Sequence, residues 1–241
     1  MVEATSDKSQ SFKHLTFNPI LTYNRVTGNE TNEHDGIASN GKMVAMAWNA
    51  MSTVAVFGTE KTRTFDATIP LLKGHTGTIY DMAWSPFEDR LLSTCADDGK
   101  VKLWVFDDYE GCYSRDNNSE PDMDIEAHPR KTLSVQWHAA AENVLATHSI
   151  DKTIKLWDIN EDRADDPIIT FTDMPDTCTS LRWSPSGSMI GAMVKNKSQL
   201  YVDPRQPDSC IKAAAHAGPR QQRMAWVDDQ TILTAGFDSS A

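Results

Sequence analysis

The strongest constraint on this chain is a pattern of histidine and tryptophan that occurs twice with identical spacing. Each copy begins with a histidine, and tryptophans follow nine and 29 residues later. The six positions are His75, Trp84 and Trp104 in the first copy and His128, Trp137 and Trp157 in the second. A unit that recurs at a fixed period predicts a fold of similar modules, each of which buries its faces against its neighbours.

Weaker copies of the same unit extend the pattern in both directions. Met174 stands nine residues before Trp183, and His216 stands ten residues before Trp226. A degenerate copy covers residues 43–57. The clearer units start at 75, 128, 174 and 216, which are 53, 46 and 42 residues apart, so the basic period is in the low forties. The chain therefore holds roughly five modules.

Each module has the pattern of short β-strands. Val101, Leu103 and Val105 alternate with residues that are also largely apolar, as expected of a strand buried between neighbouring sheets. Asp98-Gly99 is a tight-turn signal between two such runs. Short strands in units opened by Gly-His and closed by Trp-Asp are typical of WD repeats, the blades of β-propellers. The sequence therefore predicts an all-β WD-repeat β-propeller.

Four polar or aromatic positions recur at the same spacing in the two clear units, and they invite two interpretations. They are His75, Thr94, Asp98 and Trp104, and then His128, Thr147, Asp151 and Trp157. One interpretation is a catalytic or metal site. The other is a buried chain of hydrogen bonds from Trp through Thr and His to Asp, as in WD-repeat blades. We favour the second, because a structural network must recur in each blade whereas an active site is not normally built twice.

Charge and motifs exclude several classes of function. The net charge is −11 and the pI is about 5.0, so the whole molecule has no electrostatic attraction to nucleic acid or anionic membranes. Residues 107–126 carry a net charge of −7 and residues 161–176 a net charge of −5, and both stretches resemble solvated loops that could also repel or recruit a partner.

Neither a transmembrane run nor a secretory signal is visible in the sequence. The four cysteines form no Cys-x-x-Cys pair, and none of the common nucleophile, phosphate-binding or zinc-hydrolase motifs is present. We therefore predict a non-enzymatic cytoplasmic protein with free thiols and neither a metal nor a cofactor.

Beyond the repeats, the chain resembles the coronins from about Ser11 to its last residue. The resemblance rests on short motifs that occur in the family's order, none of them specific alone. They are Phe12-Lys13-His14, Arg25-Val26-Thr27, Lys61-Thr62-Arg63, Gly74-His75-Thr76-Gly77, Asp203-Pro204-Arg205 and Leu233-Thr234-Ala235-Gly236-Phe237. The segment between Arg25 and Met43 and the acidic insertion at residues 107–126 depart from the family pattern.

The resemblance implies a scaffold that binds filamentous actin, together with other actin regulators, at the actin cortex. Coronins have seven blades, a C-terminal extension and an oligomerising coiled coil. The expected organisation here is a disordered N-terminus at residues 1–10 and a partial propeller over residues 11–241. Its five blades are expected near residues 11–70, 71–110, 125–160, 168–205 and 211–241. Two blades, the extension and the coiled coil are expected to be absent, which would leave an open arc with apolar end faces.

The actin-binding candidates are basic, because actin filaments present an acidic surface. The resemblance singles out Arg25, with Lys61 and Arg63 nearby in the first unit. Further small basic clusters are Arg130/Lys131, Lys195/Lys197 and Arg220/Arg223. A general WD-repeat adaptor that presents partners in a multiprotein assembly is the alternative function.

Overall fold

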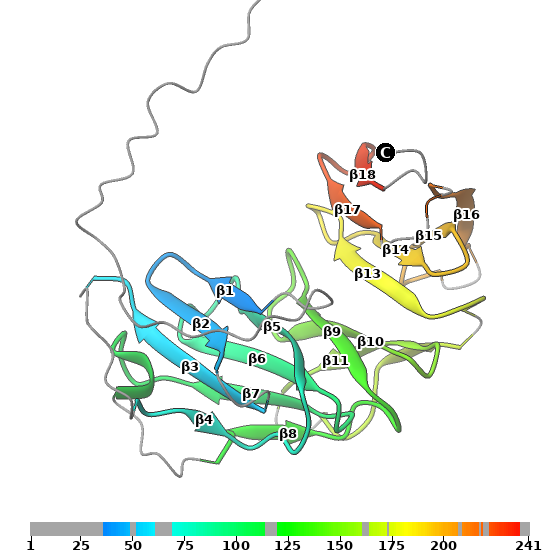
Figure 1. The fold of residues 1–241 in the computed structure, drawn as a ribbon. Coiled ribbons are helices and arrows are strands. Elements are labelled where there is room, and N and C mark those ends of the chain that lie inside the picture. The colour runs from blue at the N-terminus through cyan, green and yellow to red at the C-terminus, as the bar shows by residue number, and fades with distance from the viewer. Residues whose placement is uncertain are drawn as a thin grey trace, which may run out of the picture.

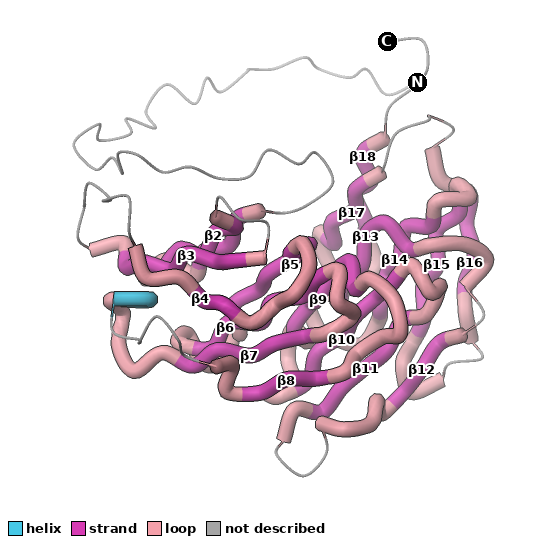
Figure 2. The backbone as a smooth tube through the Cα atoms, turned by 60° about the horizontal axis from the view of Figure 1, so that its bottom comes forward, coloured by secondary structure: helices cyan, strands magenta, loops and turns pink. Residues whose placement is uncertain are grey.

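The structure is a computed structural model in which the described residues form strands and one short helical turn. It describes residues 36–48, 52–60, 69–113, 120–160, 164–172, 174–206, 209–216, 218 and 222–236. The helical turn, η1 (Gly111–Tyr113), is the small cyan element of Figure 2. Within the described residues, no helix is long and apolar enough to cross a bilayer. The all-β prediction is confirmed.

In the described part of the chain, eighteen strands form five antiparallel sheets, and the strands of each sheet are neighbours in sequence order (Figure 1). The first sheet contains β1 (Ile37–Ser39), β2 (Met43–Ala47), β3 (Thr53–Gly58) and β4 (Leu72–Lys73). The second contains β5 (Ile79–Trp84), β6 (Leu91–Ala96), β7 (Val101–Val105) and β8 (Met123–Ile125). The third contains β9 (Thr132–Trp137), β10 (Val144–Ser149), β11 (Ile154–Asp158) and β12 (Ile169–Phe171). The fourth contains β13 (Cys178–Trp183), β14 (Ile190–Val194), β15 (Ser198–Val202) and β16 (Ile211–Ala214), and the fifth β17 (Arg223–Trp226) and β18 (Ile232–Ala235).

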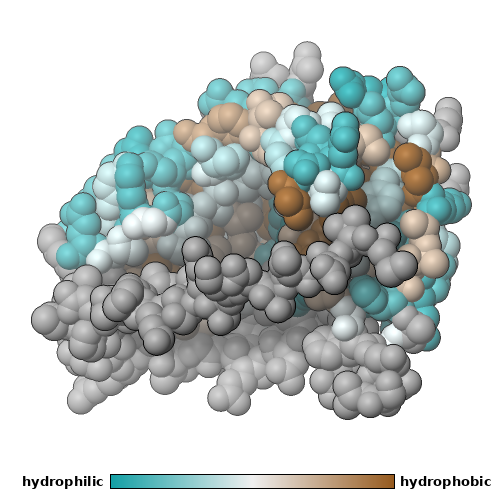
Figure 3. Space-filling view, turned by 90° about the horizontal axis from the view of Figure 1, so that it is seen from above, coloured by the Kyte–Doolittle hydropathy of each residue, from teal (hydrophilic) through white to brown (hydrophobic). Residues whose placement is uncertain are grey.

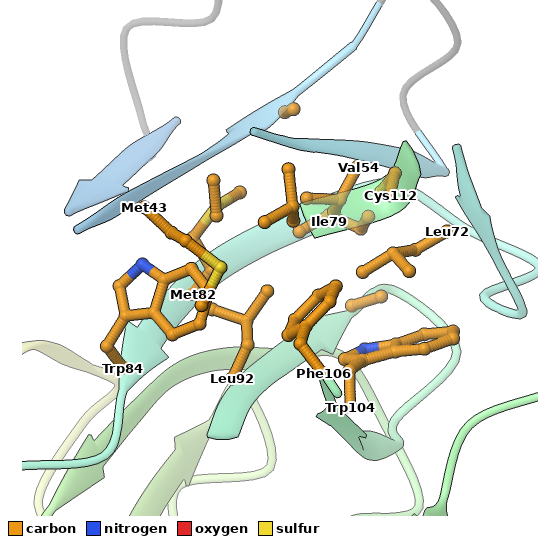
Figure 4. Packing of buried hydrophobic residues seen from close by; sticks show 14 residues of the cluster. Met43, Val54, Leu72, Ile79, Met82, Trp84, Leu92, Trp104, Phe106 and Cys112 are labelled. Atoms are coloured by element: carbon orange, nitrogen blue, oxygen red, sulfur yellow. The ribbon is translucent and has the colours of Figure 1, made fainter. Parts of the chain in front are cut away.

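The first strands of consecutive sheets contact one another in order, from β1 through β5, β9 and β13 to β17. The five sheets therefore follow one another along a curved row, as Figure 1 shows. Apolar side chains fill the space between neighbouring sheets. Figure 4 shows the first of these layers, where Met43 and Val54 of the first sheet face Leu92 and Phe106 of the second. Each sheet is buried on both faces. This explains why consecutive residues of a strand, whose side chains point to opposite faces, are largely apolar.

The sheets begin and end at different points from the sequence units. β4, β12 and β16 are the outermost strands of their sheets, yet each lies at the start of the next expected blade, at residues 71–110, 168–205 and 211–241. For example, Leu72 pairs backward with Val54 of β3. A sequence unit that begins with one of these strands therefore contributes its first strand to the preceding sheet and its other strands to the next. This overlap ties consecutive sheets together through the backbone.

Because each sheet is a simple meander, its connections alternate between two ends of the molecule. At one end lie the links between consecutive sheets and the turns between the second and third strands of each sheet. His75 and His128 lie in the links between sheets. We call it the histidine end. At the other end lie the turns between first and second strands and the connections between third and fourth strands. The connections at residues 106–122 and 159–168 belong to it, and we call it the acidic end.

Large apolar side chains are also exposed on the fifth sheet. Val227 and Leu233 are each about two-thirds exposed, at 65% and 66%. Figure 3 shows hydrophobic atoms gathered on the half of the molecule that carries the fourth and fifth sheets. Val227 follows β17 in the turn to β18, whereas Leu233 precedes Thr234 as the buried Ser93 and Ala146 precede Thr94 and Thr147 in their sheets.

Candidate functional site

In the second sheet, the four recurring side chains form one continuous chain of hydrogen bonds. The indole N–H of Trp104 donates to Thr94 Oγ1 at 3.0 Å, and Thr94 Oγ1 lies 2.8 Å from His75 Nε2. His75 Nδ1 in turn lies 3.0 Å from a carboxylate oxygen of Asp98. Nε2 thus faces the Thr94 hydroxyl and Nδ1 faces the carboxylate, so a proton on Nδ1 is in position to be donated to Asp98. We call such a chain a blade network.

The third sheet repeats the same geometry. Trp157 Nε1 donates to Thr147 Oγ1 at 3.0 Å, which lies 2.8 Å from His128 Nε2. His128 Nδ1 is 3.0 Å from Asp151. This network has one more member than the network of the second sheet. The hydroxyl of Thr153 donates a hydrogen bond to Asp151 at 2.7 Å. The structure therefore brings together both sets of residues that the spacing grouped.

Burial decides what these networks can do chemically. His75 and His128 are 7% and 6% exposed, and Thr94 and Thr147 are fully buried, so none of them has open space beside it for a substrate. Burial lowers the pKa of His128 to about 4, and the charge of Asp151 only partly opposes this. Burial works against ionisation of Asp98, but hydrogen bonds from His75 and the backbone prevail and lower its pKa to about 2. A neutral histidine held by an ionised aspartate is suited to fixing a turn.

A partial third network lies in the fifth sheet and was missed at the sequence level. His216 Nε2 is 3.0 Å from Thr234 Oγ1. The interval from histidine to threonine is 18 residues here and 19 in the other units, and Asp238 follows four residues after Thr234, outside the described residues. A search of the sequence that allowed a histidine-to-threonine interval of 18 or 19 residues would have identified this network. In the fourth sheet, Met174 and Met193 occupy the histidine and threonine positions, so that blade packs without the polar chain.

The other recurring tryptophans join neighbouring sheets. The indole N–H groups of Trp84, Trp137 and Trp226 donate to carbonyl oxygens of the preceding sheet's first strand, at Ala38 (3.3 Å), Ala83 (3.0 Å) and Arg182 (3.1 Å). Sequence reasoning used these tryptophans to find the period but assigned them no role. Trp183 is the exception, since its buried indole N–H has no hydrogen-bond partner among the described residues. Instead its ring packs on His138, with centroids 4.4 Å apart.

The actin-binding candidates are only partly covered by the structure. Arg25, Lys61, Arg63 and Arg220 lie outside the described residues. Arg130 and Lys131 lie between β8 and β9, and Lys195 and Lys197 lie between β14 and β15, so both clusters belong to the histidine end. Lys131 pairs with Asp97 at 2.6 Å. Arg223 is exposed on β17.

The described residues offer little for metal or thiol chemistry. No group of three or more His, Cys, Asp or Glu side chains in the described ranges is placed to hold a metal ion. Burial raises the pKa of the Cys178 thiol to about 12, and it also raises the pKa of Cys95. These thiols stay protonated near neutral pH and are poor nucleophiles.

Replacing Asp98 or Asp151 with alanine should destabilise the fold by about 1–3 kcal/mol, because each change removes a carboxylate that holds a buried imidazole. The loss should be smaller at Asp151, since Thr153 Oγ1 lies 3.1 Å from His128 Nδ1 and remains as a partner. The free energy of unfolding, measured with urea for each variant and the parent, tests this. Asp97→Ala is a useful comparison, because Asp97 neighbours Asp98 but pairs with the half-exposed Lys131 instead of a buried histidine. It should cost less than about 1 kcal/mol. An equal loss for Asp97→Ala and Asp98→Ala would contradict the network.

Mild acid should destabilise the protein through its buried histidines. Burial lowers the pKa of His148 to about 3, as it lowers that of His128 to about 4. Between these values and the usual 6.5, the unfolded chain binds protons that the folded chain does not, so stability falls as pH drops below about 6.5. We expect a loss of about 2 kcal/mol between pH 7 and pH 5.5. Urea unfolding curves that coincide at the two pH values would contradict this.

Comparisons with known proteins agree with the geometry. The model of the family "WD domain, G-beta repeat" matches residues 67–105 and 119–158, which are the two clear units. The chain is 31% identical over 211 residues to a coronin-like protein of Saccharomyces cerevisiae, covering 83% of this chain and 32% of that protein. It is 26% identical over 237 residues to the coronin-like protein crn1 of Schizosaccharomyces pombe, covering 95% and 39%.

Similarity to human Coronin-7 is 30% identity over 213 residues, covering 87% of this chain and 22% of that protein. The chain thus spans between about a fifth and two-fifths of the length of these relatives. Among solved structures, the WD40 domain of Toxoplasma gondii coronin superposes with a TM-score of 0.79 at 23% identity. That match covers 90% of this chain and 56% of the solved chain, so it supports the fold and a partial propeller.

Proposed function

Since this chain belongs to the coronin family of WD40 proteins, we propose that it is part of a non-enzymatic scaffold that binds actin filaments in the cytoplasm, at the cortex. The observation that carries the proposal is the similarity to coronin-like proteins along 83–95% of the chain. That similarity extends well beyond the residues matched by the general repeat model. The blade networks fit a scaffold, because their polar groups are occupied with holding turns together.

The division of charge between the two ends also supports the proposal. Actin filaments are acidic, so a binder with a net charge of −11 needs a surface where bases are concentrated. Arg130 and Lys195 are exposed at the histidine end, opposite the connections at residues 106–122 and 159–168. This end could therefore approach an acidic filament while the acidic end points away from it.

Cosedimentation of the full-length protein with actin filaments tests the proposed function. We expect the protein to pellet with filaments at low salt and to be released as salt rises, since exposed ion pairs are screened. A general WD-repeat adaptor would stay in the supernatant at every salt concentration. That result would favour the adaptor function and contradict actin binding.

Arg25 is the basic residue to test first, because the coronin resemblance singles it out. Arg25→Asp in the full-length protein should weaken filament binding at least fivefold, because an arginine can pair bidentately with surface carboxylates and an aspartate repels them. Arg163→Asp makes the same charge change within an acidic stretch and should alter binding less than twofold. Equal binding by the Arg25→Asp variant and the parent at low salt would remove Arg25 from the site.

A further inference from the structure

Four large apolar side chains are exposed at the acidic end of the second sheet, on β7 and on two connections that contact each other. Phe87 lies in the turn between β5 and β6 and is 45% exposed, and Val105 ends β7 and is 44% exposed. Tyr109 and Tyr113 follow in the connection between β7 and β8, and each is more than a third exposed. We call these four residues the aromatic patch. Exposed apolar groups gathered in one place and rimmed by polar residues are typical of protein interaction surfaces.

The two connections that carry the patch are held together by hydrogen bonds. Arg90 donates from Nη1 to the carbonyl oxygen of Asp107 at 2.9 Å, and its own carbonyl accepts from the N–H of Phe106 at 3.0 Å. The hydroxyl of Tyr109 lies 3.0 Å from the carboxylate of Asp89. The patch is therefore a fixed surface, supported on strands.

The surroundings of the patch are strongly acidic. Its two connections contain Glu88, Asp89, Asp107, Asp108, Glu110, Glu120 and Asp122. Arg90 is the base of these connections within the described residues, and it pairs with Glu88. The carboxylates of Asp107 and Asp108 are exposed and have no cationic partner in the described part of the chain. A partner would therefore meet uncompensated negative charge beside exposed rings.

The chain itself shows which group this surface accepts. Lys42, from the turn of the neighbouring sheet, places its ammonium group 4.6 Å from the centre of the Tyr109 ring. The same group pairs with Asp89 and donates to the Tyr109 hydroxyl at 3.0 Å. An aromatic face beside a carboxylate is a favourable site for a cation. Asp107 and Asp108 precede Tyr109 in the same connection, and their exposed carboxylates can accept cations from outside in the same way.

We infer that the aromatic patch and its acidic rim bind a basic segment of a partner protein, one in which lysine or arginine alternates with apolar residues. The apolar residues would cover Phe87 and Val105, and the basic residues would pair with Asp107 and Asp108. This surface is separate from the proposed actin site, because an acidic filament would be repelled from it. The inference therefore does not depend on the proposed function.

Fluorescence anisotropy tests the inference in the full-length protein, with a labelled peptide of alternating lysine and leucine as the probe. An analogous peptide of glutamate and leucine is the sign control and should not bind. Changing Asp107 and Asp108 together to asparagine should raise the Kd of the basic peptide at least fivefold. Asp165→Asn with Asp166→Asn removes the same charge at the same end, but in the third sheet, and should raise the Kd less than twofold. Phe87→Ala should raise it at least threefold.

Equal effects of the two aspartate pairs would mean that net charge, not this patch, attracts the peptide, and would overturn the inference. Absence of peptide binding would also overturn it. Sedimentation velocity supplies a third outcome. If the protein self-associates and Asp107→Asn with Asp108→Asn abolishes that association without changing peptide binding, the surface belongs to a second copy of the chain and the inference is wrong. Unchanged melting temperatures of the surface variants would show that each comparison is between folded proteins.

Discussion

Replacing Trp157 with alanine is expected to lower the free energy of unfolding by about 4 kcal/mol, the range seen for the loss of a fully buried large aromatic side chain. Trp157 is 1% exposed and packs in the layer between the second and third sheets with Leu145 and Val101. Its indole N–H also satisfies Thr147 within the blade network. Alanine would leave both a cavity and a weakened network. Urea unfolding followed by circular dichroism measures the loss.

Trp157→Phe separates the two contributions, because phenylalanine keeps most of the ring volume but cannot donate to Thr147. It should cost about 1–2 kcal/mol. If Trp157→Phe were as damaging as Trp157→Ala, the hydrogen bond rather than the packing would dominate. If Trp157→Ala cost less than about 1 kcal/mol, the side chain would not be the buried anchor that the structure describes.

Gly99→Ala is expected to destabilise the fold by about 3 kcal/mol. Gly99 has a φ of +79°, and a Cβ at this position would lie 2.3 Å from the carbonyl oxygen of His128 and 3.0 Å from that of Arg130. Both atoms belong to the backbone. The backbone at His128 cannot move away easily, because the His128 N–H donates a hydrogen bond to the Gly99 carbonyl at 2.9 Å. The loss of stability has two causes. Alanine is strained in the left-handed backbone conformation, and its Cβ would overlap with the link between the second and third sheets, which would have to move.

Gly41→Ala is a matched control for this prediction. Gly41 also has a positive φ, +88°, but a Cβ there would have no atom within 4 Å. It should therefore show only the backbone strain, about 1 kcal/mol. The difference between the two variants in urea unfolding measures the steric contribution at the contact with His128. Equal losses at the two glycines would show that this contact is unimportant.

The blade networks could be predicted from sequence because their members keep fixed intervals within one repeat. His75 and Asp98 are 23 residues apart, and so are His128 and Asp151. A single antiparallel sheet places such residues in the same relation whenever its strands and turns have the same lengths. The all-β architecture followed from the same periodicity.

Features that depend on how sheets meet could not be found in this way. The tryptophan bonds to Ala38 and Ala83 cross between sheets, and nothing in the spacing indicates which carbonyl lies opposite. The pairing of β4 with β3 reaches back across a sequence-unit boundary. The charge division required knowing that residues 106–122 and 159–168 leave from the same end. Arg25, Lys61 and Arg63 stay predictions, since they lie outside the described residues.

The central claim is that the recurring polar residues hold the blades together while partners bind at the surface. The most direct measurement is to follow melting temperature and actin cosedimentation together for Asp151→Ala in the full-length protein. The account predicts a lowered melting temperature and normal filament affinity at temperatures where the variant is still folded, with binding lost only as the protein unfolds. An unchanged melting temperature with abolished binding would contradict it, and would mark Asp151 as part of a binding site.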